Sequence, residues 1–371
     1  MPQISLIIPT INEAENLPAL MARLSETLKG RDWEAIIVDD ASSDGTPAVC
    51  ASLSKDFPIK ILSREYPTNG LSGAVLCGMA EAKGDYLVVM DADLQHPPEK
   101  VPALLEPLET NTADFAIGSR YVEGGSMEER FGLMRRLLSR FATFLASPFA
   151  GKVRDPMSGF FALRRETYLR AKRLTPIGYK IGLELMCKCQ VKSVREVPIH
   201  FGARTRGQSK FSVKEQYRYL AHLSRLYDYH FPRGSPIAKF LIVLAFSWLW
   251  AAPLYWILSK AGFRNFQSAV AAYPLAALIT SLFHYRYVRT QRAFLTTATP
   301  WRDFFFVSLF EWCACALAAV WTATRINHAS AMEVFTLSFG AAAAARYLMR
   351  KEFLLDVRGI RREIRRDELA A

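Results

Sequence analysis

Apolar residues follow two different patterns along the chain. In residues 1–230, short apolar runs alternate with stretches in which apolar residues recur at helical spacing, and this pattern predicts an α/β domain. Beyond this part, apolar residues dominate long runs at 237–258, 267–288, 303–324 and 331–349. Each run is close to the roughly 20 residues that cross a bilayer. We therefore expect two domains, 1–230 and 231–371, with a boundary at the proline- and glycine-containing segment 231–236.

The short apolar runs of the first part predict strands. They occupy residues 4–9, 35–38, 59–62, 86–90 and 115–121. Acidic residues come directly after two of these runs, Asp39 and Asp40 after the second and Asp91 and Asp93 after the fourth. Open α/β sheets bind ligands at the carboxyl ends of their strands. Asp39 and Asp40 therefore either accept hydrogen bonds from the base or ribose of a nucleotide or cap the following helix.

Asp91 and Asp93 also have two interpretations. A D-x-D pair is common and is often an ordinary turn or cap. At the rigid end of a strand, however, two carboxylates offer the hard oxygen ligands that Mg²⁺ or Mn²⁺ binds together with substrate phosphates. The chain has no G-x-G-x-x-G after its first strand and no G-x-x-x-x-G-K-[ST], so neither a dinucleotide-binding turn nor a P-loop is indicated. A metal held by carboxylates can neutralise a diphosphate instead.

Periodicity predicts several helices in the first part. One opens within 10–17, where Thr10 or Asn12 is available as N-cap, and another occupies 74–82. Residues 131–145 and 214–230 repeat apolar residues at helical spacing, with aromatic residues among them. Helices of this kind lie at a membrane interface or pack on the domain core.

Basic residues around the long apolar runs indicate how they are oriented. Arginines concentrate between the second and third runs and in the tail after the fourth. Because cytoplasmic loops carry the excess of positive charge, we expect a multi-pass membrane protein with both termini and the first domain in the cytoplasm. No N-terminal signal peptide is expected, since the first apolar run is short. A soluble four-helix bundle is the alternative, and Glu311 in the third run is either a functional group or an inter-helix hydrogen bond.

Charge and cysteine content narrow the function classes. The net charge is +12, but the basic residues flank apolar runs or crowd the C-terminal tail, which favours a membrane surface over nucleic acid as partner. The six cysteines include the C-x-C pairs Cys187/Cys189 and Cys313/Cys315, whose spacing does not suit zinc. We expect all six to be small apolar residues in a reducing compartment.

Six motifs in order give the sequence a family resemblance. They are P-T-I-N-E-A-E-N-L from Pro9, V-D-D-x-S-x-D-G-T from Val38, D-A-D-L-Q-H-P-P from Asp91, G-S-R-Y from Gly118, D-P-M-S-G-F from Asp155 and R-x-x-G-x-S-K from Arg204. Over residues 3–211 the chain resembles the family 2 glycosyltransferases, and within them the dolichol-phosphate mannose synthases and their bacterial polyprenyl-phosphate relatives. The second part is similar to the four-span GtrA-type domain. The resemblance implies a GT-A (Rossmann-like) nucleotide-sugar domain of the α/β class, followed by interfacial helices and a four-helix transmembrane bundle.

The resemblance also implies roles for matching residues. The nucleotide-sugar pocket would consist of Pro9, Ile11, Glu13, Val38, Asp40, Arg64, Asp91, Ala92, Asp93, Gln95, Arg204 and Lys210. The family commonly has an aromatic residue where this chain has Ile11. The metal, Mg²⁺ or Mn²⁺, would be held by Asp91, Asp93 and Gln95, and the acceptor phosphate by Arg120, Arg135, Ser139 and Arg204. The catalytic set would be Asp91, Asp93, Asp155 and Arg120, with Asp155 orienting the acceptor arginines, orienting the sugar or capping a turn.

The expected reaction moves a hexose from GDP-mannose or UDP-glucose to a dolichyl or undecaprenyl phosphate, with inversion. A phosphate monoester has a second pKa of about 6 and is already a nucleophile at neutral pH, so the site needs positive charge rather than a strong base. Two other functions compete with this one. A processive polysaccharide synthase would carry a Q-x-x-R-W element, which the sequence lacks. A lipid-sugar flipping or transport protein would use its soluble part only for binding.

Overall fold

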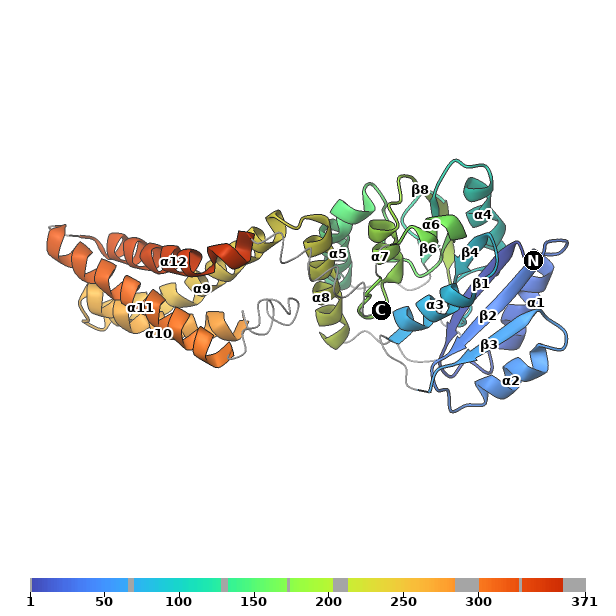
Figure 1. The fold of residues 1–371 in the computed structure, drawn as a ribbon, viewed down its shortest axis with the longest axis horizontal. Coiled ribbons are helices and arrows are strands. Elements are labelled where there is room, and N and C mark those ends of the chain that lie inside the picture. The colour runs from blue at the N-terminus through green and yellow to red at the C-terminus, as the bar shows by residue number, and fades with distance from the viewer. Residues whose placement is uncertain are drawn as a thin grey trace. The chain divides into compact units, whose positions relative to one another are not determined.

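The computed structural model describes residues 2–65, 70–127, 133–171, 174–202, 213–283, 300–326 and 329–355. The chain forms two compact units, Met1–Leu226 and Tyr227–Ala371, and the division falls inside one helix, α8. Figure 1 labels the helices and strands of each unit.

A mixed sheet forms the centre of the first unit. The strands are β1 Ile4–Thr10, β2 Trp33–Asp39, β3 Ile59–Ser63, β4 Tyr86–Val89, β5 Phe115–Ser119, β6 Ser126–Met127, β7 Phe161–Arg164, β8 Val194–Pro198 and β9 His200–Phe201. The seven-stranded sheet has the order β3-β2-β1-β4-β7-β5-β8, and β6 pairs with β9 separately. Strand β7 runs antiparallel to its neighbours β4 and β5, whereas the other pairs of this sheet are parallel. The expected α/β class is confirmed, with one reversed strand that the apolar pattern did not predict.

Helices connect these strands. Those of the first unit are α1 Leu17–Thr27, α2 Thr46–Leu53, α3 Gly70–Glu81, α4 Val101–Glu109, α5 Leu133–Ala150, α6 Arg165–Leu169, α7 Ile181–Lys188 and α8 Val213–His230, and a short 3-10 helix η1 covers Pro98–Lys100. The first predicted helix is α1, which begins at Leu17, the last residue of the interval 10–17. The expected cap was wrong, since Asn16 rather than Thr10 or Asn12 is the N-cap residue. Thr10 still belongs to β1, and Asn12 has a φ of +58°.

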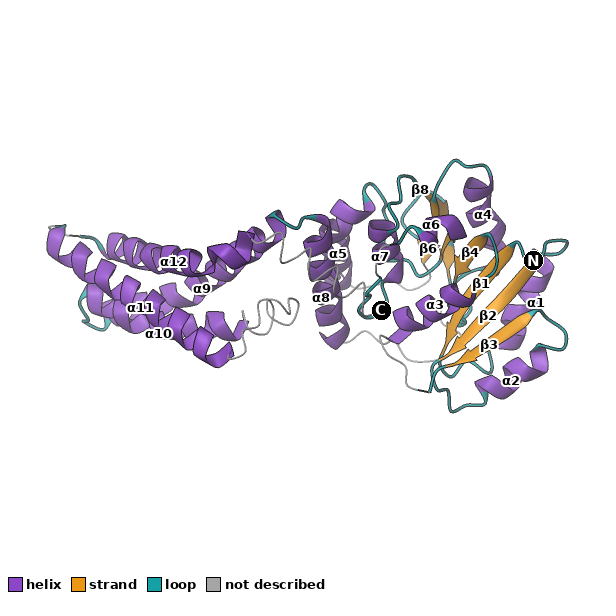
Figure 2. Cartoon of the chain, viewed as in Figure 1, coloured by secondary structure: helices purple, strands orange, loops and turns teal. Residues whose placement is uncertain are grey.

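The sheet lies between two helical layers (Figure 2). Paired residues Leu6, Val88 and Ala162 face a core formed with α1, α2 and α4. Their neighbours Ile7, Val89 and Phe161 are likewise in register with one another and face the opposite side, where α3 and α7 pack. Burial on both faces explains why the central strands read as continuous apolar runs.

Strand order places a ligand site at one edge of this sheet. From β1 the chain proceeds outward to β2 and β3, then returns to β4 on the other side of β1. The order therefore reverses between β1 and β4, and doubly wound folds bind ligands in the crevice outside the carboxyl ends of the strands at such a point.

The second unit contains four long helices. They are α9 Gly234–Lys260, α10 Asn265–Phe283, α11 Pro300–Arg325 and α12 Ala331–Leu355. Among the described residues, two stretches are long and apolar enough to cross a membrane, Ile237–Lys260 and Phe305–Arg325, a judgement that rests on length and composition. The four-span bundle is therefore not confirmed. The predicted second span extends to 288, beyond the described part of α10, and α12 carries Glu333 and Arg346.

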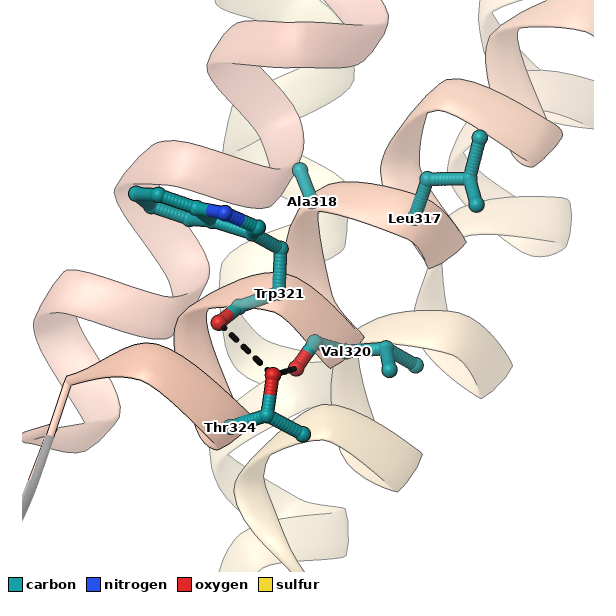
Figure 3. Close-up of a pocket in the computed structure, with 5 residues that line it drawn as sticks. All are labelled: Leu317, Ala318, Val320, Trp321 and Thr324. Atoms are coloured by element: carbon teal, nitrogen blue, oxygen red, sulfur yellow. Dashed lines mark hydrogen bonds between the residues drawn. The ribbon is translucent and has the colours of Figure 1, made fainter.

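A buried polar group joins three of these helices. Glu311 of α11 is fully buried and accepts hydrogen bonds from the hydroxyl of Tyr273 at 2.7 Å and from both Nε and Nη2 of Arg346. Tyr273 lies on α10 and Arg346 on α12, so of the two interpretations of Glu311 the inter-helix hydrogen bond is the one observed. Toward its C-terminus α11 presents an exposed apolar surface, with a shallow hollow lined by Leu317, Ala318, Val320, Trp321 and Thr324 (Figure 3).

Candidate active site

The loops that follow β1 and β2 are joined by hydrogen bonds. The backbone N–H of Asn12 donates to Ser42 Oγ at 2.8 Å, and the Asn12 side-chain oxygen accepts from the N–H of Ser43 at 2.9 Å. The N–H of Glu13 donates to Thr46 Oγ1 at 3.0 Å. These bonds hold the two motifs that begin at Pro9 and Val38 side by side, as the sheet topology predicts.

The predicted nucleotide residues surround the ends of the first three strands. Pro9 and Val38 are buried within β1 and β2, while Ile11 is 45% exposed just beyond β1. Asp40 forms an ion pair of 2.9 Å with Arg64, whose backbone N–H also donates to the carbonyl of Asp39. In this structure, therefore, the Asp40 carboxylate pairs with another predicted pocket residue.

Unusual backbone conformations occur in three of the loops at this edge. Asn12, Ala41 and Leu94 have φ values of +58°, +53° and +61°, and they follow β1, β2 and β4. Positive φ costs non-glycine residues of order 1–3 kcal/mol, and such residues concentrate at functional sites. Their placement marks the carboxyl edge as the candidate site independently of the sequence motifs.

The D-x-D-x-Q segment after β4 has a defined geometry. Asp93 and Gln95 are buried, whereas the Asp91 side chain is 36% exposed. Asp93 Oδ1 accepts from the backbone N–H of Gln95 at 3.2 Å, and Gln95 Nε2 donates to the carbonyl of Gly202 at 3.0 Å. His96 Nδ1 accepts from the backbone N–H of Asp91 at 3.0 Å. The segment is thus held in place at both its ends.

A buried ion pair joins the fourth and fifth motifs. Asp155, 1% exposed, accepts from Arg120 Nε at 2.7 Å, from Arg120 Nη2 at 2.8 Å and from the Arg120 backbone N–H at 3.1 Å. The N–H groups of Arg154 and Asp155 in turn donate to Glu196. Of the three roles considered for Asp155, orientation of an acceptor arginine is the one that this geometry supports.

Aromatic contacts link this ion pair to the acidic segment. The ring of Phe201 lies 5.2 Å from the Arg120 guanidinium carbon and 5.5 Å from the ring of His96. His96 also stacks on Phe160 with ring centroids 5.2 Å apart. Residues from β4, β5, β7 and β9 or their flanking loops, together with the N-cap residue of α7, therefore meet at one place. We call it the carboxylate site, and its members are Asp91, Asp93, Gln95, His96, Arg120, Asp155, Lys180 and Phe201.

Lys180 and Phe201 are the members that the sequence motifs did not reveal. Lys180 is the charged one of the two. Its Nζ donates to the carbonyl of Met157 at 2.8 Å, within the loop that begins at Asp155. Burial, together with the positive charge of Arg120, lowers the pKa of Lys180 to about 8, although Asp155 and Asp91 act in the opposite direction. A lysine directly before an apolar helical segment was the available signal, and alone it identifies no function.

Two further groups have shifted pKa values. Burial lowers the pKa of His96 to about 4, so its ring is neutral at pH 7 and Nδ1 can accept the Asp91 N–H. Burial also acts to lower the pKa of Arg120, but the hydrogen bonds and charge of Asp155 outweigh it and raise the pKa. The arginine is therefore a permanent positive charge beside the acidic segment.

The residues present fit a divalent cation. Two carboxylates and the amide oxygen of Gln95 form a hard oxygen donor set, which suits Mg²⁺ or Mn²⁺. In the described part of the chain, no group of three or more His, Cys, Asp or Glu residues is arranged to hold a metal. Asp91 and Asp93 therefore suit a cation whose coordination is completed by substrate phosphates and water rather than by an all-protein cage.

The remaining predicted residues are placed in part. Ser139 lies partly buried on α5. Arg135 belongs to the same helix, but its side chain lies outside the described residues, as do Arg204 and Lys210 entirely. Glu13 and Ala92 lie at the ends of β1 and β4, with Glu13 Oε2 accepting from Asn16 at 2.6 Å.

The chain is similar to known proteins over much of its length. Residues 5–170 match the model of glycosyl transferase family 2. The chain is similar to a dolichol-phosphate mannosyltransferase of Pyrococcus furiosus, with 41% identity over 74% of this chain and 78% of the relative. The corresponding Saccharomyces cerevisiae protein is 40% identical over 61% of this chain and 88% of its own.

One solved structure also resembles the first unit. It is glucosyl-3-phosphoglycerate synthase from Mycobacterium tuberculosis in complex with Mn²⁺, UDP and its product, with a TM-score of 0.47, 22% identity and coverage of 62% of this chain and 80% of that chain. This likeness is too slight to assign a substrate or a metal here. The sequence identity to the mannosyltransferases is sufficient by itself: the chain belongs to the family 2 glycosyltransferases.

Proposed function

We propose that this enzyme transfers mannose from GDP-mannose to a polyprenyl phosphate, with inversion at the anomeric carbon. The names of relatives with 40–41% identity support the lipid acceptor and favour mannose over glucose. The observation that carries the proposal is the carboxylate site itself. There an acidic segment suited to a metal–diphosphate lies with Arg120 and Lys180, two cations, at one end of the sheet.

The reaction brings two anions together, and positively charged residues of the site would offset their repulsion. An oxygen of the acceptor phosphate attacks the anomeric carbon and forms the new C–O bond, while the bond from that carbon to the diphosphate breaks. Attack from the face opposite the leaving group inverts the configuration. Because the acceptor is largely dianionic near pH 7, no general base has to remove a proton.

Arg120 would bind the acceptor phosphate. Asp155 accepts from Nε and Nη2 of the guanidinium, which fixes its plane. Lys180, directly before α7, adds a second positive charge. Fixing both charges before the substrates arrive lowers the cost of bringing the reacting groups together.

The acidic segment would bind the donor. Asp91, Asp93 and Gln95 would hold a divalent cation, which when bound supplies Lewis-acid neutralisation of the departing diphosphate. His96 keeps the Asp91 backbone in position, and the bond from Gln95 Nε2 to Gly202 directs the amide. The residues beyond β1 to β3, among them Ile11, Asp40 and Arg64, would bind the nucleoside.

Exposed apolar surfaces support a membrane location. In the most apolar stretch of α9 and of α11, 18% and 28% of the residues are buried. A core helix of a soluble protein is mostly buried. On the first unit, α5 exposes Phe141 and Phe144, and α8 exposes Tyr217 and Leu220. We propose that α5 and α8 lie at the cytoplasmic membrane surface, where a lipid-linked phosphate is available.

Purified full-length protein tests the proposal directly. It is incubated with labelled GDP-mannose or UDP-glucose, a short polyprenyl phosphate and Mg²⁺ or Mn²⁺, and extracted lipid is assayed for label. We expect mannose transfer that depends on the cation and is abolished by Asp93→Ala in a folded, membrane-inserted protein. Unchanged lipid-linked sugar in the Asp93→Ala protein would refute the mechanism, and donor binding without transfer would favour a transport protein.

A further inference from the structure

A second buried polar cluster lies outside the carboxylate site. Glu184, on α7, is fully buried, and its Oε1 accepts from Lys188 Nζ and from the backbone N–H of Thr175, both at 2.6 Å. Its Oε2 lies 3.0 Å from Nε2 of His222 on α8. Lys188 Nζ also donates to Thr175 Oγ1 at 3.1 Å. We call these four residues the Glu184 cluster.

Stability alone does not account for such a cluster. Burying Glu184 and Lys188 removes two charges from water, and well-packed apolar residues of similar volume are often as stable. The cluster is also incomplete, because Nδ1 of the buried His222 has no hydrogen-bond partner among the described residues. The Glu184 carboxylate, with its three hydrogen-bond donors, instead fixes the direction of each group that it binds.

The groups bound by Glu184 hold one segment, residues 174–180. At its start, Thr175 is held by Glu184 through its N–H, and its carbonyl lies 3.5 Å from Nη1 of Arg225 on α8. In its middle, the carbonyl of Gly178 accepts from the N–H of Ser72 on α3 at 3.2 Å. At its end stands Lys180, which is also the N-cap residue of α7.

Segment 174–180 therefore connects α8 to the carboxylate site. Glu184 follows Lys180 by one helical turn, so a change in the position of α7 against α8 is passed to Lys180. That lysine bonds to the Asp155 loop through Met157. In an active site, a displacement of about 1 Å at a remote position can cost a factor of about 100 in rate.

We propose that Glu184 and His222 are positioning residues for sugar transfer, which hold segment 174–180 so that the Lys180 ammonium stays beside Arg120 and Asp155. This inference rests on the proposed function. It adds a role for the α7–α8 contact that the six sequence motifs do not contain.

The test compares two replacements of His222 in the full-length protein. His222→Gln can place an amide nitrogen near the position of Nε2 and still donate to Glu184, whereas His222→Leu cannot. We expect His222→Leu to lower kcat by about 30- to 100-fold with KM for the nucleotide sugar changed by less than about threefold. His222→Gln should retain kcat within about threefold of the wild type. His230→Leu, at the exposed end of the same helix, is the matched control.

Combination with Lys180→Met separates positioning from general damage. If His222 acts through Lys180, His222→Leu has little further effect on kcat once Lys180 is Met. The proposal would be overturned if His222→Leu lowered kcat by the same factor with Lys180 as with Lys180→Met. A destabilised His222→Leu protein with the kcat of the wild type would also overturn it. Should His222→Leu not fold, the shorter His222→Asn, whose amide does not reach Glu184, takes its place.

Hydrogen exchange of segment 174–180 gives a readout that is independent of activity. We expect faster exchange at Thr175 and Gly178 in His222→Leu than in His222→Gln or His230→Leu. If the wild type transfers no sugar but this difference is present, the proposed function fails and the link from α8 to the segment stands. If the wild type transfers sugar normally and His222→Leu exchanges no faster than the other two variants, the positioning role is refuted.

Discussion

Lys180 is the residue of the carboxylate site whose charge depends most on its neighbours. Its Nζ bonds to Met157, while Arg120 disfavours its protonated form and Asp155 and Asp91 favour it. Burial is the largest effect, and with the charge of Arg120 it outweighs the two carboxylates and lowers the pKa. The resulting pKa of about 8 is close to neutral pH, so a bound anion has a large effect on the protonation of Lys180.

This balance predicts the pH dependence of sugar transfer. Because the protonated lysine is the form that neutralises phosphate and its pKa is about 8, kcat/KM should fall above about pH 8. In the kcat profile, which reports the substrate complex, bound phosphate should move this limb to higher pH. Lys180→Arg, which stays charged, should remove the limb from kcat/KM, and an unchanged limb in that variant would assign it to another group.

The same shift has a consequence for stability. Between about pH 8 and the ordinary lysine value of 10.5, the unfolded chain binds more protons at this position than the native one. The free energy of unfolding therefore increases as the pH rises across that range, and this increase is lost as the pH falls toward 8.

Asp155 supports a second prediction. Asp155→Asn removes the negative charge and one of the two oxygen acceptors of a largely buried guanidinium, so we expect the free energy of unfolding to fall by about 3 kcal/mol and kcat to fall by about 100-fold. Glu99→Gln is the matched control, since Arg23 and Glu99 form an equally bidentate pair with 41% and 53% of their side chains exposed. The control should cost less than about 1 kcal/mol. Equal losses in denaturant titrations of both variants would contradict a special role for Asp155.

At the level of residues, the motifs located the site but not its pairings. Asp91, Asp93, Gln95, Arg120 and Asp155 were all predicted, and the structure brings them to one edge of the sheet. That Asp155 binds Arg120 depends on two loops meeting across 35 positions of sequence. Spacing along the chain cannot show such a meeting. Lys180, Glu184 and His222 belong to no motif, and only folding makes them neighbours.

At the level of elements, apolar runs predicted the strands β1 to β5 but neither the parallel strand β8 nor the reversed strand β7. The strands β1, β2, β4 and β5 are largely buried and read as apolar runs, and β3 is a partly buried apolar run. Strand β7 is four residues long, and its direction is set by pairing with β4 and β5, which no local pattern encodes. The N-cap of α1 was predicted too early, because Thr10 and Asn12 are suitable caps whose side chains here bind to β2 and to the loop that follows it.

The contact of α3 with the sheet supports a prediction at this scale. A Cβ added at Gly78 would lie 2.6 Å from Ile7 Cγ2 and 3.0 Å from Val38 Cγ2, both on buried strands. Alanine gains about 1 kcal/mol in helix propensity but overpacking costs about 1–3 kcal/mol, so Gly78→Ala should be destabilising by roughly 1 kcal/mol. Gly340→Ala, in a helix with no heavy atom of the described residues near its added Cβ, should be neutral or stabilising. Denaturant titration of each variant decides the sign.

At the level of the whole molecule, the second unit shows why hydropathy alone did not settle the number of spans. On a hydropathy scale, an arginine and a glutamate make an apolar helix look more polar. Arg346 and Glu311, however, bind each other, so little charge remains for the surroundings to solvate. Intramembrane charges of this kind usually face the interior of a bundle and pair there. The burial of Glu311 and its bond to Tyr273 agree with that arrangement.

The pair therefore predicts strong non-additivity in the bundle. Glu311→Leu leaves the Arg346 guanidinium buried without its carboxylate, and Arg346→Leu leaves the reverse, so each should lower the free energy of unfolding by roughly 3 kcal/mol. The double variant removes both charges at once and should lose less than either single variant, because no buried charge remains unpaired. Thermal unfolding of the purified protein in detergent, followed by a probe in α9 to α12, measures this directly. Losses that simply add would mean that the two side chains are solvated separately, and the four helices would then need another explanation for carrying charges at these positions.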